Sequence, residues 1–87
     1  MAIGIQALQQ NTTGNNNVAI GEYALQSSET SDSNTAVGHS ALRNNTANNN
    51  TAVGYSSLKA NTSGSGNTSI GTQALSSNTI GINNTAI

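Results

Sequence analysis

The chain has 87 residues, of which 33% are hydrophobic, and it contains two Tyr, one His and neither Phe, Trp nor Cys. Its two basic and three acidic residues leave a net charge of −1, which excludes the basic surface that nucleic acid or an anionic membrane requires. Without Cys there is no disulfide framework and no thiolate metal site, and too few apolar residues remain for a compact core. We therefore expect neighbouring chains or long hydrogen-bonded ladders to stabilise the fold.

Nearly the same nine residues recur along the chain, as "NTAVGHSAL" from Asn34, "NTAVGYSSL" from Asn50 and "NTSIGTQAL" from Asn67. Aligned on the small residue before the aliphatic one, the units begin near Ala2, Ala19, Ala36, Ala52 and Ser69, with a partial unit at Ala86. The third unit is one residue shorter than the others, which are equal in length. This spacing indicates a single repeat array over residues 1–87, in which stacking buries the face that one unit cannot bury alone.

Each unit opens with a predicted strand, because a β-branched residue alternates with small ones. We expect the aliphatic residues of this strand to form one column of the core, namely Ile3, Ile20, Val37, Val53 and Ile70. A Gly follows in every unit and predicts the first turn, at Gly4, Gly21, Gly38, Gly54 and Gly71. A small residue and a Leu come next, and the second predicted core column is Leu8, Leu25, Leu42, Leu58 and Leu75.

A second turn is predicted at Gly14, Gly64 and Gly81, where the aligned residues of the other units are Ser31 and Asn48. Asn is the non-Gly residue that best tolerates positive φ, so Asn48 is expected to make the same left-handed turn. The one-residue deletion of the third unit is placed directly after Asn48. The connecting stretches contain Asn, Ser, Thr and Gly, which favour turns over helix, and columns of Asn and Thr are expected to form side-chain ladders.

These elements predict an all-β fold, a parallel β-solenoid of about five coils of 17 residues, each with two short strands and two turns. Like positions of successive coils are expected to stack at about 4.8 Å, the ordinary strand spacing. Because the chain begins and ends inside the repeat, we expect it to be a segment of a longer fibre. No run has the features of a secretory signal or of a transmembrane segment, so we expect no membrane insertion by this segment.

The unit N-T-A-[IV]-G-x-x-A-L, followed by N-T-[TS]-G, resembles the head repeats of trimeric autotransporter adhesins and related repeats of bacterial surface fibres and phage tail fibres. The resemblance covers essentially the whole chain. It implies a left-handed β-roll assembled as a homotrimer, in an extracellular location on a bacterial cell surface or virion. It also implies attachment as the function, with a host-cell surface, matrix protein or polysaccharide as partner. A trimer would resolve the shortage of core, because thin aliphatic columns can pack around a shared axis.

Two groups of residues suggest chemistry. His39 shares a column with Ile5, Glu22, Tyr55 and Thr72, so the side chains of Glu22, His39 and Tyr55 are expected to be neighbours. Zinc needs three or four ligands, which one His and one Glu per chain do not supply, unless three His39 side chains converge in a trimer. We therefore predict no metal and no other cofactor. Arg43 and Lys59 share another column and are either candidate contacts for an anionic polysaccharide or solvated cations.

Other functions would draw on the same columns. No Ser or Thr has a partner base and the three carboxylates fall in different columns, so no enzymatic activity is expected. An ice-binding solenoid would use the column of Thr35, Thr51, Thr68 and Thr85, but the residue two places on is predicted to be buried, which removes the second outward Thr rank. Amyloid-type assembly would use the Asn-rich composition, whereas the fixed Gly positions favour a folded coil.

Overall fold

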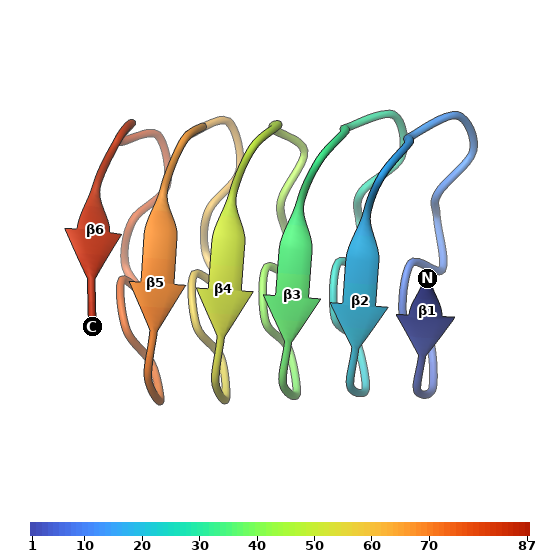
Figure 1. Ribbon diagram of the computed structural model, residues 1–87, viewed down its shortest axis with the longest axis horizontal. Coiled ribbons are helices and arrows are strands. Elements are labelled where there is room, and N and C mark those ends of the chain that lie inside the picture. The colour runs from blue at the N-terminus through green and yellow to red at the C-terminus, as the bar shows by residue number, and fades with distance from the viewer.

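The computed structural model describes residues 1–87 and is all-β. Six short strands lie in one parallel sheet, in the order β1-β2-β3-β4-β5-β6, and the chain winds through about five coils (Figure 1). The strands are β1 (Ala2–Ile3), β2 (Val18–Ile20), β3 (Thr35–Val37), β4 (Thr51–Val53), β5 (Thr68–Ile70) and β6 (Thr85–Ala86). The predicted parallel β-solenoid is thus confirmed. Nowhere does the chain form a helix of the length and apolarity that crossing a membrane requires.

Each strand pairs with the strand one coil further along the chain. Ala19 pairs with Ala36, and Ala36 pairs with Ala52, so the shorter third unit keeps the register. Backbone hydrogen bonds between coils continue beyond the strands, as from Leu25 N–H to Ala41 O at 3.0 Å. The ladder of backbone bonds therefore extends around the coil and is not confined to the sheet.

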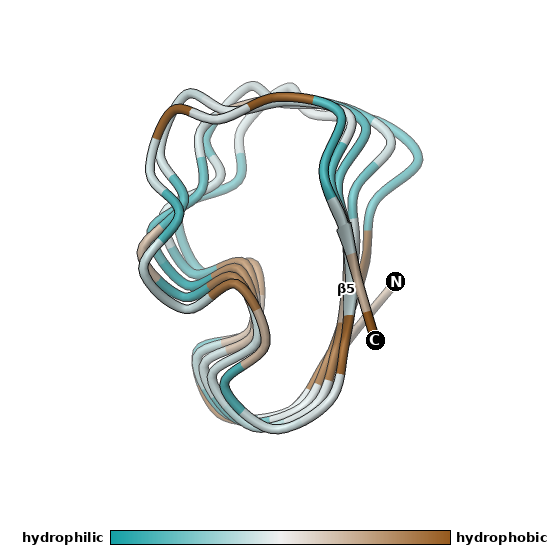
Figure 2. Ribbon diagram, turned by 90° about the vertical axis from the view of Figure 1, so that its left-hand side faces the viewer, coloured by the Kyte–Doolittle hydropathy of each residue, from teal (hydrophilic) through white to brown (hydrophobic).

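Each coil contains one strand rather than the two that the sequence predicted. The stretch after the first turn Gly is a run of tight turns in which left-handed residues recur at every second position. In the third coil these are Ser40, with φ of 61°, and Leu42, with φ of 51°, and the same two positions are left-handed in every other coil. Such alternation bends the backbone toward the interior (Figure 2), so this stretch cannot extend as a strand.

The interior is narrow and is filled by small and medium-sized side chains. The middle residues of the four central strands point inward and are fully buried, namely Ala19, Ala36, Ala52 and Ser69. The inward bend opposite the strands carries the Leu column, in which Leu25, Leu42 and Leu58 are fully buried and Leu8 and Leu75 of the end coils are partly buried. Figure 2 shows this bend as a hydrophobic segment that faces the strands. The apolar core contains only eight buried residues, so apolar burial alone gives this fold little stability.

The aliphatic column of the strands lies on the outer surface, which corrects the prediction that these residues belong to the core. Successive side chains of a strand point to opposite faces, so an inward Ala places both of its neighbours outward. The column comprises Ile3, Ile20, Val37, Val53 and Ile70, of which Ile3 is 55% and Ile70 is 40% exposed, while the middle three are half-buried between adjacent coils. The residues on the other side of the inward position, such as Thr35, point outward for the same reason.

The first turn requires Gly for two reasons. The five glycines of this column have φ between 125° and 131°, a region that residues with a Cβ atom rarely adopt. A Cβ on Gly38 would also lie 2.6 Å from Gly54 O of the next coil. The close approach of successive coils at this turn therefore depends on the missing side chain.

The second turn differs from the prediction. Its left-handed residues are Asn16, Ser33, Asn49, Gly66 and Asn83, whereas Gly14, Gly64 and Gly81 lie outside the left-handed region. The prediction for Asn48 is wrong, because Asn49, with φ of 63°, makes the left-handed turn. Gly64 is instead required by space, since a Cβ there would lie 2.3 Å from Gly81 O of the next coil.

The shorter turn of the third coil explains the error at Asn48. Ala47 O accepts a hydrogen bond from Asn34 Nδ2 at 2.8 Å, just as Gly64 O accepts one from Asn50 Nδ2 at 2.9 Å. Ala47 therefore occupies the position of the turn Gly. The deletion lies before Ala47 rather than after Asn48, and this shifts the alignment by one residue.

Buried Asn side chains form two ladders beside the apolar core. The strand-side ladder comprises Asn17, Asn34, Asn50, Asn67 and Asn84, each directly before a strand. Oδ1 of each of the first four accepts the backbone N–H of the next at 2.9 Å, and Nδ2 donates to a turn carbonyl of the next coil at 2.8–2.9 Å.

The turn-side ladder comprises Asn11, Ser28, Asn45, Asn61 and Asn78. Its Asn side chains donate to a carbonyl of their own turn, and Asn61 and Asn78 also donate to the preceding Asn of the ladder, at 2.7 and 3.0 Å.

Candidate functional site

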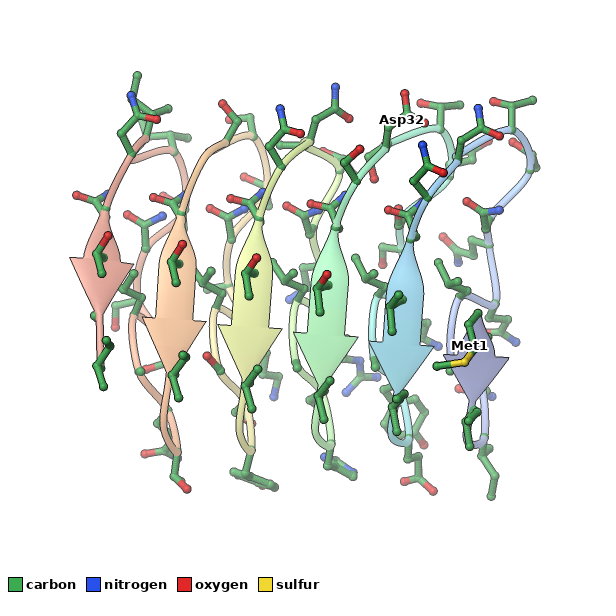
Figure 3. All side chains as sticks on the ribbon, in the orientation of Figure 1. Met1 and Asp32 are labelled. Carbon is green, nitrogen blue, oxygen red and sulfur yellow. The ribbon has the colours of Figure 1, made fainter.

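Two columns of side chains cross the outer face of the sheet, which is called the sheet face below (Figure 3). The aliphatic rank is Ile3, Ile20, Val37, Val53, Ile70 and Ile87, and the second rank is Val18, Thr35, Thr51, Thr68 and Thr85. Pairing of β3 with β4 places Thr35 beside Thr51 and Val37 beside Val53, so both ranks are in register along the stack. Neither rank contains a charged residue. The sheet face is therefore a regular surface with one apolar edge and one hydroxyl edge.

A signal for this orientation was present in the sequence. The middle position of the strands holds only Ala or Ser, which are the sizes that a narrow interior admits. A core-facing column in a single chain would be expected to hold the larger Ile and Val residues. The constant small residue, rather than the aliphatic one, thus marks the inward direction.

A second surface lies where the chain leaves β2, β3 and β4, and it is called the aromatic strip below. It comprises Glu22, Tyr23, His39, Arg43, Tyr55 and Lys59, from the second, third and fourth coils. The His39 ring stacks on the Tyr55 ring, with centroids 5.4 Å apart and an interplanar angle of 18°. The Tyr23 ring meets His39 edge to face at 5.5 Å, and His39 Nε2 lies 3.3 Å from Glu22 Oε1. The structure thus brings Glu22, His39 and Tyr55 together as predicted.

Arg43 and Lys59, which the sequence leaves as candidate ligand contacts or solvated cations, lie on the flank of the strip. The Arg43 guanidinium carbon lies 4.3 Å from the centroid of the Tyr23 ring, and its Nε donates to Gln26 Oε1 at 3.0 Å. Lys59 takes the same column one coil later. The one contact between a basic and an acidic side chain joins His39 and Glu22, so the Lys59 ammonium has no carboxylate partner.

Tyr23 is the member of the strip that the sequence did not reveal. Its column also holds Gln6, Ser40, Ser56 and Gln73, so nothing in that column indicates a contact. The contact arises between columns, because Arg43 reaches back one coil to the Tyr23 ring. A search for aromatic and cationic residues near each other in neighbouring coils could have found it.

The chemistry that these surfaces allow is that of contact rather than of an enclosed site. No pocket opens on the surface, and no three His, Cys, Asp or Glu side chains come together. His39 Nδ1 lies 3.0 Å from Ser40 Oγ, so both ring nitrogens face other side chains of the chain. The remaining acidic residues, Glu29 and Asp32, lie on the turn before β3, whereas the strip follows the strands. Figure 3 shows Asp32 on the side where the strands begin.

No family model, curated protein or solved structure matches this chain. Its function is therefore inferred from the sheet face and the aromatic strip, together with the repeat itself.

Proposed function

We propose that this chain is a structural and adhesive segment of an extracellular trimeric fibre, on a bacterial cell surface or in a phage tail fibre. In this proposal three copies lie parallel and pack their sheet faces around a common axis, with the coils winding in the left-handed sense. The observation that carries the proposal is the aliphatic rank, which runs in register along the whole face and lies outside the core.

Burial energetics support the trimer. Full burial of a Val or Ile side chain is worth about 1.5–3 kcal/mol relative to exposure, and the partly covered residues of this rank would gain a fraction of that each. Because six such residues lie in one rank, three chains would bury eighteen of them together. The rank and its Thr neighbour carry no charge, so like copies can approach without repulsion.

The winding in Figures 1 and 2 supports the left-handed sense. The C-terminal end faces the viewer in Figure 2, and the chain runs down the strand side on the right while it advances toward the viewer. A trimer of such coils would form a rod whose length grows with the number of units. The surfaces that remain outside would be free to meet a host cell, a matrix protein or a polysaccharide.

Sedimentation equilibrium of the 87-residue chain tests this proposal. We expect three chains of 8.7 kDa in the particle, and an unfolding midpoint that rises with protein concentration. The double substitution Val37→Asp with Val53→Asp should give monomers, because charges would be buried at the axis. Thr13→Asp with Ser63→Asp adds the same charge to exposed turn positions and should leave the trimer intact. A wild-type monomer at micromolar concentration would contradict the proposal.

A second candidate, an ice-binding solenoid, is favoured by one observation. Thr35, Thr51 and Thr68 point outward in register, and the aliphatic rank lies beside them rather than in the core. Both ranks would then contact ice on a flat face that must be free of other chains. Thermal hysteresis of a monomeric sample would support this function, whereas a trimer without hysteresis would exclude it.

A further inference from the structure

Most of the aromatic and charged side chains of the molecule lie together in the aromatic strip. It holds both Tyr residues, the single His, both basic residues and Glu22, whereas the only charged side chains elsewhere in the chain are those of Glu29 and Asp32. The interior at this level is closed by Ala24, Ala41 and the Leu column, so the strip side chains are not needed to fill it. The strip lies after the strands, next to the sheet face but not on it, so packing of sheet faces around an axis would leave it accessible.

Tyr55 presents a flat apolar platform. His39 covers one face of its ring from the preceding coil, at a centroid distance of 5.4 Å. The other face looks toward the following coil, where the same column holds Thr72, a smaller residue. Tyr55 is 51% exposed, which is high for an aromatic side chain that already has a stacking partner. A ring with one supported face and one open face is suited to stack on a second flat, partly apolar group.

Cationic donors flank this platform. Arg43 uses its Nε on Gln26 and lays its guanidinium over Tyr23, which leaves the remaining guanidinium N–H groups as donors. The Lys59 ammonium has no carboxylate partner in the chain. These two residues occupy the same column of adjacent coils, so their backbone positions are separated by about one strand spacing, about 4.8 Å along the axis. The Arg43 guanidinium reaches back one coil from its own position, so the two cations extend along the strip. Two such donors beside an open ring favour a ligand that has both a flat apolar face and an anionic group.

We propose that the aromatic strip binds an acidic oligosaccharide. One sugar ring stacks on the open face of Tyr55 through its C–H groups, and a carboxylate or sulfate of the ligand pairs with Lys59 and Arg43. Gln26 Nε2 donates hydrogen bonds of 2.9 Å to Gln6 Oε1 and to Gln9 Oε1, and these three amides line the edge of the strip. The amides and the Glu22 carboxylate can bind sugar hydroxyls. This inference deepens the proposed attachment function and rests on it, because it names the class of partner.

The dimensions favour a saccharide over a protein partner. A stable protein interface buries about 800 Å² on each side, whereas the whole chain exposes 4193 Å² and the strip covers one turn region of three coils. The strip has no pocket that would take an anchoring side chain. An extended chain of sugar rings, by contrast, can lie along the coils with successive rings near successive columns.

Calorimetric titration with three hexasaccharides tests the proposal. Hyaluronan hexasaccharide carries carboxylates, heparin hexasaccharide carries sulfates as well, and chitohexaose carries no charge. We expect binding of at least one acidic hexasaccharide and weaker or no binding of chitohexaose. Tyr55→Ala should weaken the acidic ligand about tenfold, Tyr55→Phe should retain most of the affinity, and Lys59→Gln with Arg43→Gln should abolish the preference for charge. Ile80→Ala removes a 71% exposed apolar side chain from another turn and should have no effect.

Three outcomes would overturn the proposal. The first is no binding of either acidic hexasaccharide by the folded wild-type chain. The second is binding that Tyr55→Ala leaves unchanged, which would reduce the effect to attraction between two cations and a polyanion. The third is Tyr55-dependent capture by a fibronectin-coated sensor without binding of any saccharide, which would make the strip a protein contact. Sedimentation of the same samples separates this failure from that of the fibre, since a trimer that binds no saccharide retains the proposed assembly.

Discussion

Two ladders of buried Asn run along the stack, and they differ in one coil. The strand-side ladder is unbroken from Asn17 to Asn84, and each internal side chain has a partner for its oxygen and for its amide group. The turn-side ladder is interrupted by Ser28, and Asn11 Oδ1, which faces that interruption, is the one buried side-chain polar atom without a hydrogen-bond partner. The difference shows what a polar interior requires here. The side-chain oxygen of each Asn is satisfied only where the next coil supplies a hydrogen-bond donor at the matching position.

The interruption involves two positions that change together. In the first, fourth and fifth coils the ladder Asn is followed three residues later by Gly, and a Cβ on Gly64 would lie 2.6 Å from Asn61 Oδ1. The second coil has Ser31 at this place, so an Asn at position 28 would meet its side chain. Ser28 Oγ instead hydrogen-bonds to Ser31 Oγ. The pair satisfies itself within the coil and contributes nothing to the coil before it.

Removal of an internal member of the unbroken ladder should have the largest effect. Asn50→Ala removes donors to Asn45 Oδ1 and Gly64 O and leaves the buried Asn67 N–H without its acceptor. We expect the free energy of unfolding to fall by about 3–4 kcal/mol, measured by urea denaturation followed by circular dichroism. Asn11→Ala is the matched control and should cost less than about 1 kcal/mol, because Asn11 makes one long bond of 3.4 Å to Gly14 O. Equal losses at the two positions would contradict the comparison.

The Gly of the second turn should be the next most sensitive position. Gly64→Ala places a methyl group 2.3 Å from Gly81 O and 2.6 Å from Asn61 Oδ1, so the coils must separate locally. We expect a loss of about 2–3 kcal/mol in the same denaturation experiment. Ala47→Gly at the equivalent position of the shorter turn is the control and should cost about 0.5–1 kcal/mol through backbone entropy alone. A Gly64→Ala protein as stable as wild type would show that the spacing of the coils is not set at this turn.

Repair of the interrupted ladder should raise stability. Ser28→Asn alone should cost about 1–2 kcal/mol, because the larger side chain would meet that of Ser31. Ser31→Gly alone should cost about 1 kcal/mol, because it removes the hydrogen-bond partner of Ser28 and raises the backbone entropy of the unfolded chain. Together they should give a protein about 1 kcal/mol more stable than wild type, since the introduced amide donates to Asn11 Oδ1. A double-mutant cycle measures this as a favourable coupling of about 3–4 kcal/mol. Simple additivity of the two losses would refute the account of Ser28.

The smallest effect is expected where a polar pair can be removed as a unit. Ser57 Oγ lies 2.7 Å from Ser69 Oγ across the interior, at two positions where the preceding coils have Ala41 and Ala52. Ser57→Ala with Ser69→Ala should change the free energy of unfolding by less than about 0.5 kcal/mol, because both hydroxyls are removed together. Ala74 O also accepts from Ser69 Oγ at 2.7 Å, and it keeps its bond from Leu58 N–H. Ser57→Ala alone should cost about 1 kcal/mol. A large loss in the double variant would indicate that the hydroxyl pair stabilises the stack in a way that the Ala coils lack.

The repeat period predicted the stacking well and the direction of the side chains poorly. The regular spacing of the units determines which positions lie above one another, and the strand register follows this spacing throughout. Period alone does not say which of two adjacent columns faces inward. Size and polarity predict Val37 in the core, whereas the narrow interior admits Ala36. The rule that apolar residues lie inside fails here because the narrow interior admits only Ala or Ser at the middle of the strand, which leaves the larger aliphatic residue on the outer face.

The sequence predicts contacts between side chains that share one column of the repeat, but not contacts between side chains of different columns. Glu22, His39 and Tyr55 share one column, and the sequence placed them together. The contact of Arg43 with Tyr23 joins different columns, and it depends on the inward bend that left-handed residues such as Leu42 produce. No sequence rule assigns positive φ to Leu, because a side chain makes this conformation uncommon, at a cost of about 1–3 kcal/mol per residue. Here backbone bonds between coils, such as Leu42 N–H to Ser57 O at 3.0 Å, compensate that cost. The number of strands per coil was missed for the same reason.

Native-state hydrogen exchange tests most directly the central claim that polar ladders, rather than an apolar core, hold the coils together. The backbone N–H groups of Asn34, Asn50 and Asn67 each donate to an Asn Oδ1 of the preceding coil at 2.9 Å. We predict that these three amides exchange only through global unfolding and are among the slowest in the chain. Exchange of these amides as fast as that of the exposed turn amides of Asn48 and Ser63 would contradict the account.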